Sequence, residues 1–286
     1  MSKREPLTDK CIVLDLDETL ICTLDLYSDL QRLEIMNDPK LLSVRQRLYI
    51  LRLLDVDTKR GKGEKQSMWG IERPYLDDFL EFCGIYFNKV IIWTAGVQNY
   101  ADLICQHIFK NQNYWPDLIY SRDDCVEVEI DGKKMRTKPL EKLYNEPKLK
   151  GAATPQNTLA IDNNDETFQQ NLENAVHIPD FDPKLELEKN QKLSKKDLLL
   201  DDVCLVQLEQ WLISKKVIIA KDVRTLDKSK IFTEDLKANP MEESNDEEDS
   251  VKSTEDSMDI EVGKSQDEES SEFEPMKYSN EISVGA

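Results

Sequence analysis

The chain has 286 residues, a length that allows one large domain or two small ones. Hydrophobic residues make up 39% of it and charged residues 33%, so the chain is polar but can still form a core. Its net charge of −19 disfavours general nucleic-acid binding, which depends on Lys and Arg, and no apolar run approaches the roughly 18 residues of a membrane span.

The first predicted element is a strand at Cys11–Leu14, because four apolar residues in a row are typical of a strand buried on both faces. The sequence DLDETL follows it at 15–20. The ten residues before the strand, MSKREPLTDK, lack the apolar stretch and small-residue cleavage site of a signal peptide. We therefore expect an intracellular protein, nuclear or cytoplasmic, that is neither secreted nor membrane-bound.

An insert at about 24–72 interrupts the pattern after this strand. It contains a short helix candidate at Leu24–Met36 and two strand candidates at Arg47–Val56 and Ser67–Glu72, which predict a hairpin. The connection TKRGKGEK is basic. Such a tip is usually a solvated turn, but it is also suited to guiding an anionic substrate.

Helices and strands alternate after the insert. A helix is predicted at Pro74–Cys83, with Gly84 as its stop, and a second helix at Val97–Phe109. Strands are predicted between and beyond them, and a closing helix completes the series. The strands lie at Lys89–Trp93, Asp117–Tyr120, Asn157–Ile161 and Val176–Ile178, and the closing helix at Asp197–Ile213.

This alternation predicts an α/β fold, a Rossmann-like, doubly wound parallel sheet with a small inserted hairpin. We assign 1–235 to this domain. The last 46 residues hold 16 acidic and 3 basic residues, and they show no periodic apolar pattern. We expect 236–286 to be a disordered acidic tail, which serves either solubility or interaction and phosphorylation.

The six cysteines are scattered without a C-x-x-C pair, and only two histidines are present. We therefore expect reduced thiols and neither a zinc site nor a histidine-rich metal site.

Polar residues follow the predicted strands at their carboxyl ends, where the active site of such a sheet lies. The residues that gather at the sheet edge are Asp15, Asp17, Thr19, Thr94, Arg122, Asp162 and Asn163.

Carboxylates together with an amide are oxygen ligands suited to Mg²⁺. A carboxylate can also attack phosphorus to form an aspartyl-phosphate, while a second one protonates the leaving oxygen and later activates water. A hydroxyl and a cation would then hold the phosphoryl oxygens, and Lys138 in RTKPLEKLY is the candidate cation.

Six segments in order resemble the haloacid dehalogenase superfamily, and more narrowly its small phosphatases of the RNA polymerase II C-terminal repeat domain (CTD). Large DNA viruses also encode compact proteins of this kind. The likeness spans about Cys11 to Trp211. The segments are DLDETL (15–20), RPYLDDFL (73–80), WTAGVQNYAD (93–102), YSRDDC (120–125), the Lys138 segment and IDNN (161–164).

The resemblance implies a role for each matching residue. Asp15 matches the nucleophile and a Mg²⁺ ligand, and Asp17 matches the general acid/base whose carbonyl also binds the metal. Thr94 matches the hydroxyl that binds the phosphoryl group, and Lys138 matches the cation that neutralises it. Asn163 matches a Mg²⁺ ligand.

Further residues match by resemblance alone. Asp162 matches the residue that orients a metal-bound water. Thr19 matches the residue that steadies the loop, Arg122 a basic residue near the phosphopeptide, and Tyr100 an aromatic in a peptide-side pocket. Gly96 departs from the family, which commonly has a small polar residue there.

These matches predict a Mg²⁺-dependent Ser/Thr phosphatase of phosphoproteins, which acts through an aspartyl-phosphate intermediate. The polymerase repeat is one candidate substrate. We expect a monomer with no membrane association and no direct nucleic-acid binding. Two alternatives stay open: a phosphatase of a small molecule or nucleic-acid end, and a non-catalytic module that binds peptides or phosphopeptides.

Overall fold

The computed structural model describes residues 5–24, 27–58, 61–130, 132–184, 192–233 and 281–282. Apart from 281–282, the predicted acidic tail lies outside these residues. Within the described part of the chain, no helix is long and apolar enough to cross a membrane.

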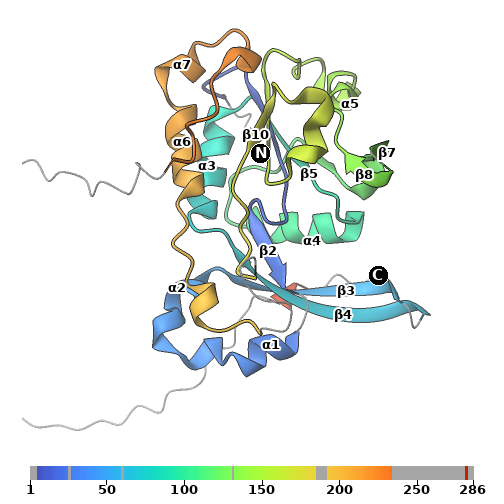
Figure 1. The fold of residues 1–286 in the computed structure, drawn as a ribbon, viewed down its shortest axis with the longest axis vertical. Helices are drawn as coiled ribbons and strands as arrows, with labels where there is room; N and C mark the ends of the chain where they lie inside the picture. The colour runs from blue at the N-terminus through green and yellow to red at the C-terminus, as the bar shows by residue number, and fades with distance from the viewer. Residues whose placement is uncertain are drawn as a thin grey trace, which may run out of the picture. The chain divides into compact units, whose positions relative to one another are not determined.

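A five-stranded parallel sheet forms the centre of the fold, in the order β10-β9-β1-β5-β6 (Figure 1). Leu14, the last residue of β1, pairs with Ile92 on one side and Ile161 on the other. The predicted α/β fold with a parallel sheet is confirmed, and β1 is completely buried. The strands are β1 (Cys11–Leu14), β5 (Lys89–Trp93), β6 (Leu118–Tyr120), β9 (Thr158–Asp162) and β10 (Ala175–His177).

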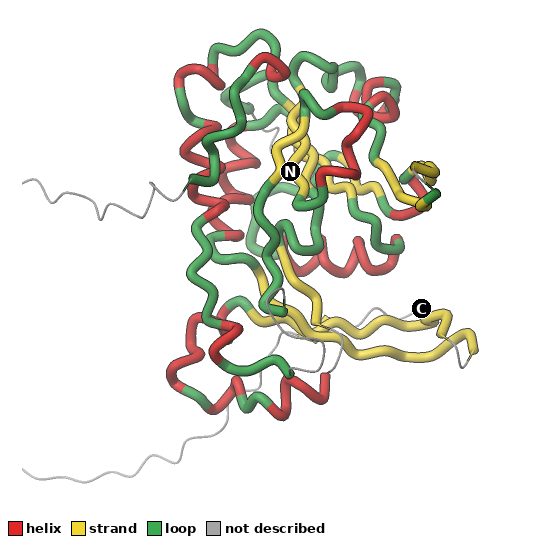
Figure 2. Tube along the Cα trace, viewed as in Figure 1, coloured by secondary structure: helices red, strands yellow, loops and turns green. Residues whose placement is uncertain are grey.

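Helices cover both faces of this sheet, as Figures 1 and 2 show. They are α3 (Leu76–Tyr86), α4 (Gln98–Ile108), α5 (Glu141–Tyr144), α6 (Cys204–Leu212) and α7 (Lys215–Ile218). Ile12 and Leu14 belong to a core with side chains of α3, α4 and α6, whereas Cys11 and Val13 belong to one with Leu143 of α5. Alternate residues of one strand therefore fill two separate cores, which explains its unbroken apolar run.

Several helix boundaries differ from the prediction. Gly84 does not stop α3, which continues to Tyr86. A Cβ at Gly84 would lie 2.3 Å from the ring of Tyr114, so this glycine serves close packing. The closing helix begins at Cys204 and not at Asp197, because Lys196–Leu198 form a separate 3-10 turn.

The predicted hairpin of the insert is confirmed, with longer strands than expected. β3 (Leu48–Thr58) and β4 (Gly61–Glu72) belong to a second, four-stranded sheet with β2 (Ile21–Leu24) and β11 (Glu281–Ile282). β2, which the sequence did not predict, pairs antiparallel with β4. Two short helices, α1 (Tyr27–Arg32) and α2 (Leu42–Gln46), complete the insert.

A further antiparallel hairpin was also missed. It consists of β7 (Val126–Ile130) and β8 (Lys133–Thr137), and it lies between β6 and α5 in the chain. Lys138 follows its last residue directly. The hairpin therefore delivers the predicted cation to the carboxyl edge of the sheet.

Candidate active site

A tight turn after β1 presents Asp15 and Asp17. The carbonyl of Leu16 accepts hydrogen bonds from the amides of Thr19, Leu20 and Ile21. Glu18 adopts a φ of +58°, in the left-handed region that few side chains occupy. The turn is therefore held in one conformation, and it places two carboxylates at the edge of the sheet.

The carboxylate of Asp15 shares an ammonium group with Asp162. Lys138 Nζ lies 2.6 Å from Asp15 Oδ1 and 2.6 Å from Asp162 Oδ2. All three side chains are at least nine-tenths buried. The amide of Lys138 also donates to the carbonyl of Thr167 (2.7 Å), which fixes the start of this segment. The structure thus brings together the ends of β1, β8 and β9.

The cluster of Asp15, Asp17, Asp162 and Lys138 carries more negative than positive charge. Burial raises the pKa of Asp15 to about 7; Lys138 opposes the shift, and the nearby carboxylates of Asp162 and Asp17 add to it. For Lys138, burial works against the charge, but Asp15 and Asp162 outweigh it and raise its pKa above the ordinary value. The three carboxylates face a single ammonium.

Asp17 accepts its hydrogen bonds from hydroxyl groups. The Tyr100 hydroxyl donates to Asp17 Oδ1. Burial raises the pKa of Asp17, whereas hydrogen bonds from Tyr100, Thr94 and Thr23 and the charge of Lys138 lower it. Thr94 follows β5, is 1% exposed, and also accepts a hydrogen bond from the amide of Gly96 (2.9 Å). The sequence-predicted Thr94 therefore lies at the site.

Thr19 and Asn163 form a second polar link across the sheet edge. Thr19 Oγ1 accepts from the Asn163 amide (3.1 Å) and donates to Asn163 Oδ1 (3.2 Å). The Asn163 side chain donates in turn to Asp180 (2.7 Å) and Glu18 (3.2 Å). Thr19 is fully buried, so it steadies the loops that carry the site.

Arg122 lies beside the cluster and not within it. Its side chain is exposed, and Nε donates to the carbonyl of Ala95 (2.8 Å). Its amide donates to the carbonyl of Gly96 (2.7 Å). This places Arg122 against the loop that follows Thr94, at the open side of the site.

Comparison with known proteins identifies the family. The model of the "NLI interacting factor-like phosphatase" family matches residues 10–224, three quarters of the chain. The chain belongs to this family. Its members are phosphatases, a class of phosphoric monoester hydrolases, and no curated protein matches the chain.

Two solved structures are similar to this NLI interacting factor-like phosphatase. The first is Fcp1, described as an essential RNA polymerase II CTD phosphatase, with a TM-score of 0.52 and 18% identity; the match covers 71% of this chain and 61% of Fcp1. The second is a variant of the fission yeast CTD phosphatase Fcp1 bound to beryllium fluoride, with a TM-score of 0.47, 17% identity, and coverage of 71% and 49%. This chain thus spans about three fifths of the first structure, and that likeness supports the fold.

Arg73 also bears on the site, although no role was predicted for it. It is completely buried, and its guanidinium binds Asp202 through two hydrogen bonds of 3.0 and 2.8 Å. It also donates to the carbonyls of Thr19 (2.8 Å) and Pro179 (2.8 Å). Arg73 therefore ties the Asp17 turn to two distant segments. The only signal for it was its place in the segment RPYLDDFL.

The donor set of the site fits a divalent cation. Within the described residues, no group of three or more His, Cys, Asp or Glu side chains is arranged to hold a metal. The Asp15 carboxylate, the Asp17 carbonyl and the Asn163 side-chain oxygen, which here accepts from Thr19, are oxygen donors of the kind that Mg²⁺ prefers. The surplus of negative charge around Lys138 also favours a cation here.

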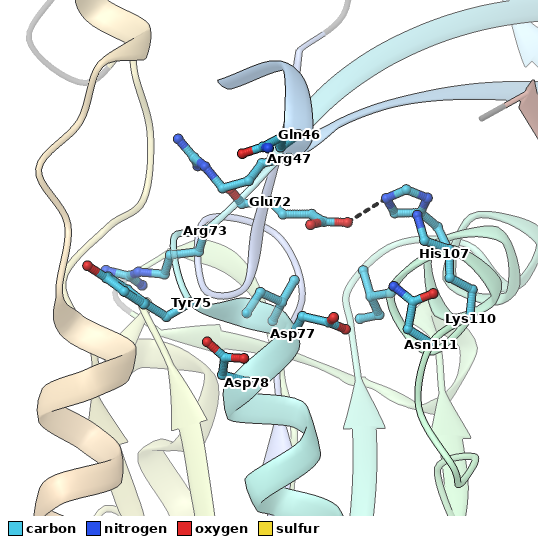
Figure 3. Close-up of a pocket in the computed structure, with 12 residues that line it drawn as sticks. Gln46, Arg47, Glu72, Arg73, Tyr75, Asp77, Asp78, His107, Lys110 and Asn111 are labelled. Carbon is cyan, nitrogen blue, oxygen red and sulfur yellow. Dashed lines mark hydrogen bonds and ion pairs between the residues drawn. The ribbon is translucent and has the colours of Figure 1, made fainter. Parts of the chain in front are cut away.

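A pocket of about 280 Å³ is lined by residues of the insert, α3 and α4 (Figure 3). Glu72 and His107 line it, and His107 Nε2 lies 2.6 Å from Glu72 Oε1. Both basic and acidic side chains surround the pocket, among them Arg47, Lys110 and Asp77. Arg73 also lines it, whereas Asp15, Asp17 and Lys138 do not.

Proposed function

We propose that this chain is a Mg²⁺-dependent phosphatase of phosphoserine or phosphothreonine in proteins, which works through an aspartyl-phosphate on Asp15. One observation carries the proposal. Two aspartates, two residues apart, are held in different ways: Asp15 by an ammonium and Asp17 by hydroxyl groups. A nucleophilic carboxyl group must be ionised and a proton-donating one must be protonated, so the two need different surroundings.

In the first step, an oxygen of Asp15 attacks phosphorus and the ester P–O bond breaks. The Lys138 ammonium favours the carboxylate form of Asp15, the form that can attack, against the burial that raises its pKa to about 7. Asp17 gives its proton to the leaving oxygen, so the product leaves as an alcohol. The buried position of Asp17 raises its pKa, which favours the protonated form that this step requires.

In the second step, water attacks phosphorus and the bond to Asp15 breaks. Asp17 now takes the proton from the water, which restores both aspartates. Thr94 and Lys138 bind the phosphoryl oxygens in both steps, because they lie on either side of the two aspartates. No further cofactor is needed for the proton balance.

Phosphatases of this family generally use Mg²⁺. Here Asp15, the Asp17 carbonyl and Asn163 would hold the ion, with Asp162 orienting a bound water. When bound, the ion supplies positive charge to the phosphoryl oxygens. The chain's own groups then need to offset less of the repulsion between a phosphate dianion and the carboxylates.

The substrate proposal rests on the family and on Arg122. A solved structure with the same fold carries the description of a polymerase CTD phosphatase, which makes the phosphorylated polymerase repeat the first substrate to test. Arg122 is exposed beside the Thr94 loop, where a peptide flanking the phosphate would pass. Thr19 and Tyr100 are buried, so we assign them to holding the site together rather than to binding the peptide.

A substrate panel tests this function. The purified chain with Mg²⁺ is given an aryl phosphate, phosphoserine and phosphothreonine peptides, nucleotides and sugar phosphates, with and without EDTA. We expect hydrolysis of aryl phosphate and phosphopeptides that EDTA abolishes, and inhibition by beryllofluoride, which mimics the acyl phosphate. Turnover of nucleotides without turnover of any phosphopeptide would replace the peptide hypothesis with the small-molecule alternative. Peptide binding without turnover of any substrate would favour a binding module.

A further inference from the structure

The Tyr100 hydroxyl that donates to Asp17 is the last donor of a longer, partly buried hydrogen-bond chain that begins in the insert. Tyr100 of α4 donates to Asp17. The Tyr100 hydroxyl lies 2.5 Å from Thr23 Oγ1 in β2, and Thr23 Oγ1 lies 2.7 Å from the hydroxyl of Tyr49 in β3. Four polar groups from the core and the insert therefore form one continuous line.

The protons of this chain have a direction. The single proton of the Tyr100 hydroxyl is engaged with Asp17, so the single proton of Thr23 goes either to Tyr100 or to Asp17, which Thr23 also contacts. The proton of Thr23 is then used, so Tyr49 must donate to Thr23. Burial raises the pKa of Tyr49 well above its ordinary value, which keeps its hydroxyl protonated. Each donor polarises the next, and the chain ends on the carboxylate.

Two glycines make room for the two tyrosines. Gly70 of β4 pairs with Thr23 on one side and with Tyr49 on the other, and a Cβ there would lie 2.3 Å from the Tyr49 hydroxyl. Tyr49 reaches Thr23 across this gap. Gly96 does the same for Tyr100, because a Cβ at Gly96 would lie 2.6 Å from its ring. The departure at Gly96 from the family pattern thus has a steric reason.

The far end of the chain is closed off from solvent. Tyr49 is completely buried, and its ring centroid lies 5.1 Å from that of His107, whose own partner is Glu72 (Figure 3). Tyr49 is therefore shielded from solvent, and its hydroxyl is available to donate to Thr23.

We propose that Tyr49 and Thr23 are positioning residues for the proton transfer at Asp17: together with Tyr100 they hold its carboxylate in the orientation from which the proton is transferred. This inference rests on the proposed function, in which Asp17 protonates the leaving oxygen. It also gives the insert a part in the reaction, since Tyr49, Thr23 and Gly70 belong to the insert sheet.

Two substrates with different leaving groups test the proposal. An alkyl phosphate such as phosphoserine needs its leaving oxygen protonated, whereas an aryl phosphate with a good leaving group needs this far less. Tyr49→Phe keeps the ring and removes only the hydroxyl. We expect kcat on the alkyl phosphate to fall about tenfold, kcat on the aryl phosphate to fall less than about threefold, and KM to stay unchanged for both.

Variants at Thr23 and a matched tyrosine complete the test. Thr23→Val breaks the chain and should reproduce the loss, whereas Thr23→Ser keeps the hydroxyl and should restore activity. The double variant Tyr49→Phe/Thr23→Val should lose no more than either single variant, because both act through one chain. Tyr86→Phe is the control: Tyr86 is also buried and donates to the carbonyl of Leu212 (2.7 Å), but it is not part of the chain.

The outcomes separate the inference from the proposed function. If the unaltered protein hydrolyses neither substrate, the proposed function fails. If it hydrolyses both, and Tyr49→Phe and Thr23→Val lower both rates equally or not at all, the positioning role is overturned. The same holds if Tyr86→Phe gives the same leaving-group dependence.

Discussion

The two halves of the candidate site hold the same kind of side chain in opposite ways. On one side, Asp15 shares the Lys138 ammonium with Asp162, and the partners are charges. On the other side, Asp17 accepts hydrogen bonds from neutral hydroxyls. The ammonium favours the ionised form of Asp15 against the burial that raises its pKa to about 7, whereas the hydroxyls orient the carboxylate of Asp17. The proposed nucleophile and the proposed acid/base therefore differ in environment and not in residue type.

The largest expected effect comes from removing the charge of Asp15. Asp15→Asn removes the nucleophile but keeps its shape, so we expect turnover to fall by about four orders of magnitude or more. The thermal midpoint should not fall, because the buried carboxylate is costly to keep ionised. Aryl phosphate turnover and thermal unfolding measure the two effects, and full activity in this variant would refute the mechanism.

Removing the cation should damage stability as well as activity. Lys138→Met leaves Asp15 and Asp162 buried without their partner, which we expect to cost about 3–5 kcal/mol in the free energy of unfolding. Turnover of aryl phosphate and of phosphopeptide should fall alike, because Lys138 touches the phosphoryl group itself. Urea unfolding measures the cost. Lys142→Met is the control, since its ion pair with Asp124 is partly exposed and should contribute under about 1 kcal/mol.

Arg122 should affect only the peptide. Arg122→Ala should lower kcat/KM for a phosphopeptide by a free energy of about 1–3 kcal/mol, the range of a hydrogen bond to a charged group. Its effect on aryl phosphate should be small, because the side chain contacts Ala95 and not the Asp15 cluster. Arg136→Ala, at an exposed position on β8, provides a comparison. An equal loss on both substrates would instead make Arg122 a ligand of the phosphoryl group.

The smallest expected effect is a shift in melting temperature with Mg²⁺ and pH. The pKa of Asp15 is raised to about 7 in the metal-free protein, so the folded state binds a proton that the unfolded state has lost above about pH 4. Stability from this group therefore falls as pH rises from about 4 to 7. At pH values below the pKa of Asp15, a cation must displace the proton from the Asp15 carboxyl group before it can bind there.

We therefore expect Mg²⁺ to raise the melting temperature by a few degrees at pH 8 and by less at pH 6. Thermal unfolding at both pH values, with Mg²⁺ or with EDTA, provides the measurement. Asp15→Asn should remove the difference between the two pH values. An equal shift at pH 6 and pH 8 in the unaltered protein would contradict the assignment of the site to Asp15.

The parallel core was predictable because each strand combines an apolar run with a polar end. Cys11–Leu14 followed by Asp15 is such a case, since a strand buried on both faces needs no partner information to be recognised. Lys138 was proposed as the cation first from the sequence RTKPLEKLY and then from the resemblance. The hairpin that carries it, β7 and β8, alternates apolar with charged residues in VEVEI and lacks a continuous apolar run.

The polar links within the site could not be predicted from the sequence. Arg73 and Asp202 lie far apart in the chain and meet only through the tertiary fold. The line from Tyr49 to Asp17 depends on the register that places Gly70 between two strands. One residue of slippage would turn Tyr49 to the opposite face of the sheet, and sequence patterns do not determine that register.

The bonds of Arg73 also set an order of events during synthesis. Its partners are the carbonyls of Thr19 and Pro179 and the carboxylate of Asp202, so a ribosome that has made only the first half of the chain has exposed Arg73 and the Asp17 turn without two of the three. A guanidinium cannot be buried until those partners arrive. The turn that carries Asp17 therefore reaches its final form late, after the segments around 179 and 202 have emerged. Contacts between such distant parts of a chain are slow to form, and the catalytic turn is expected to be among the last features of the newborn protein to become ordered.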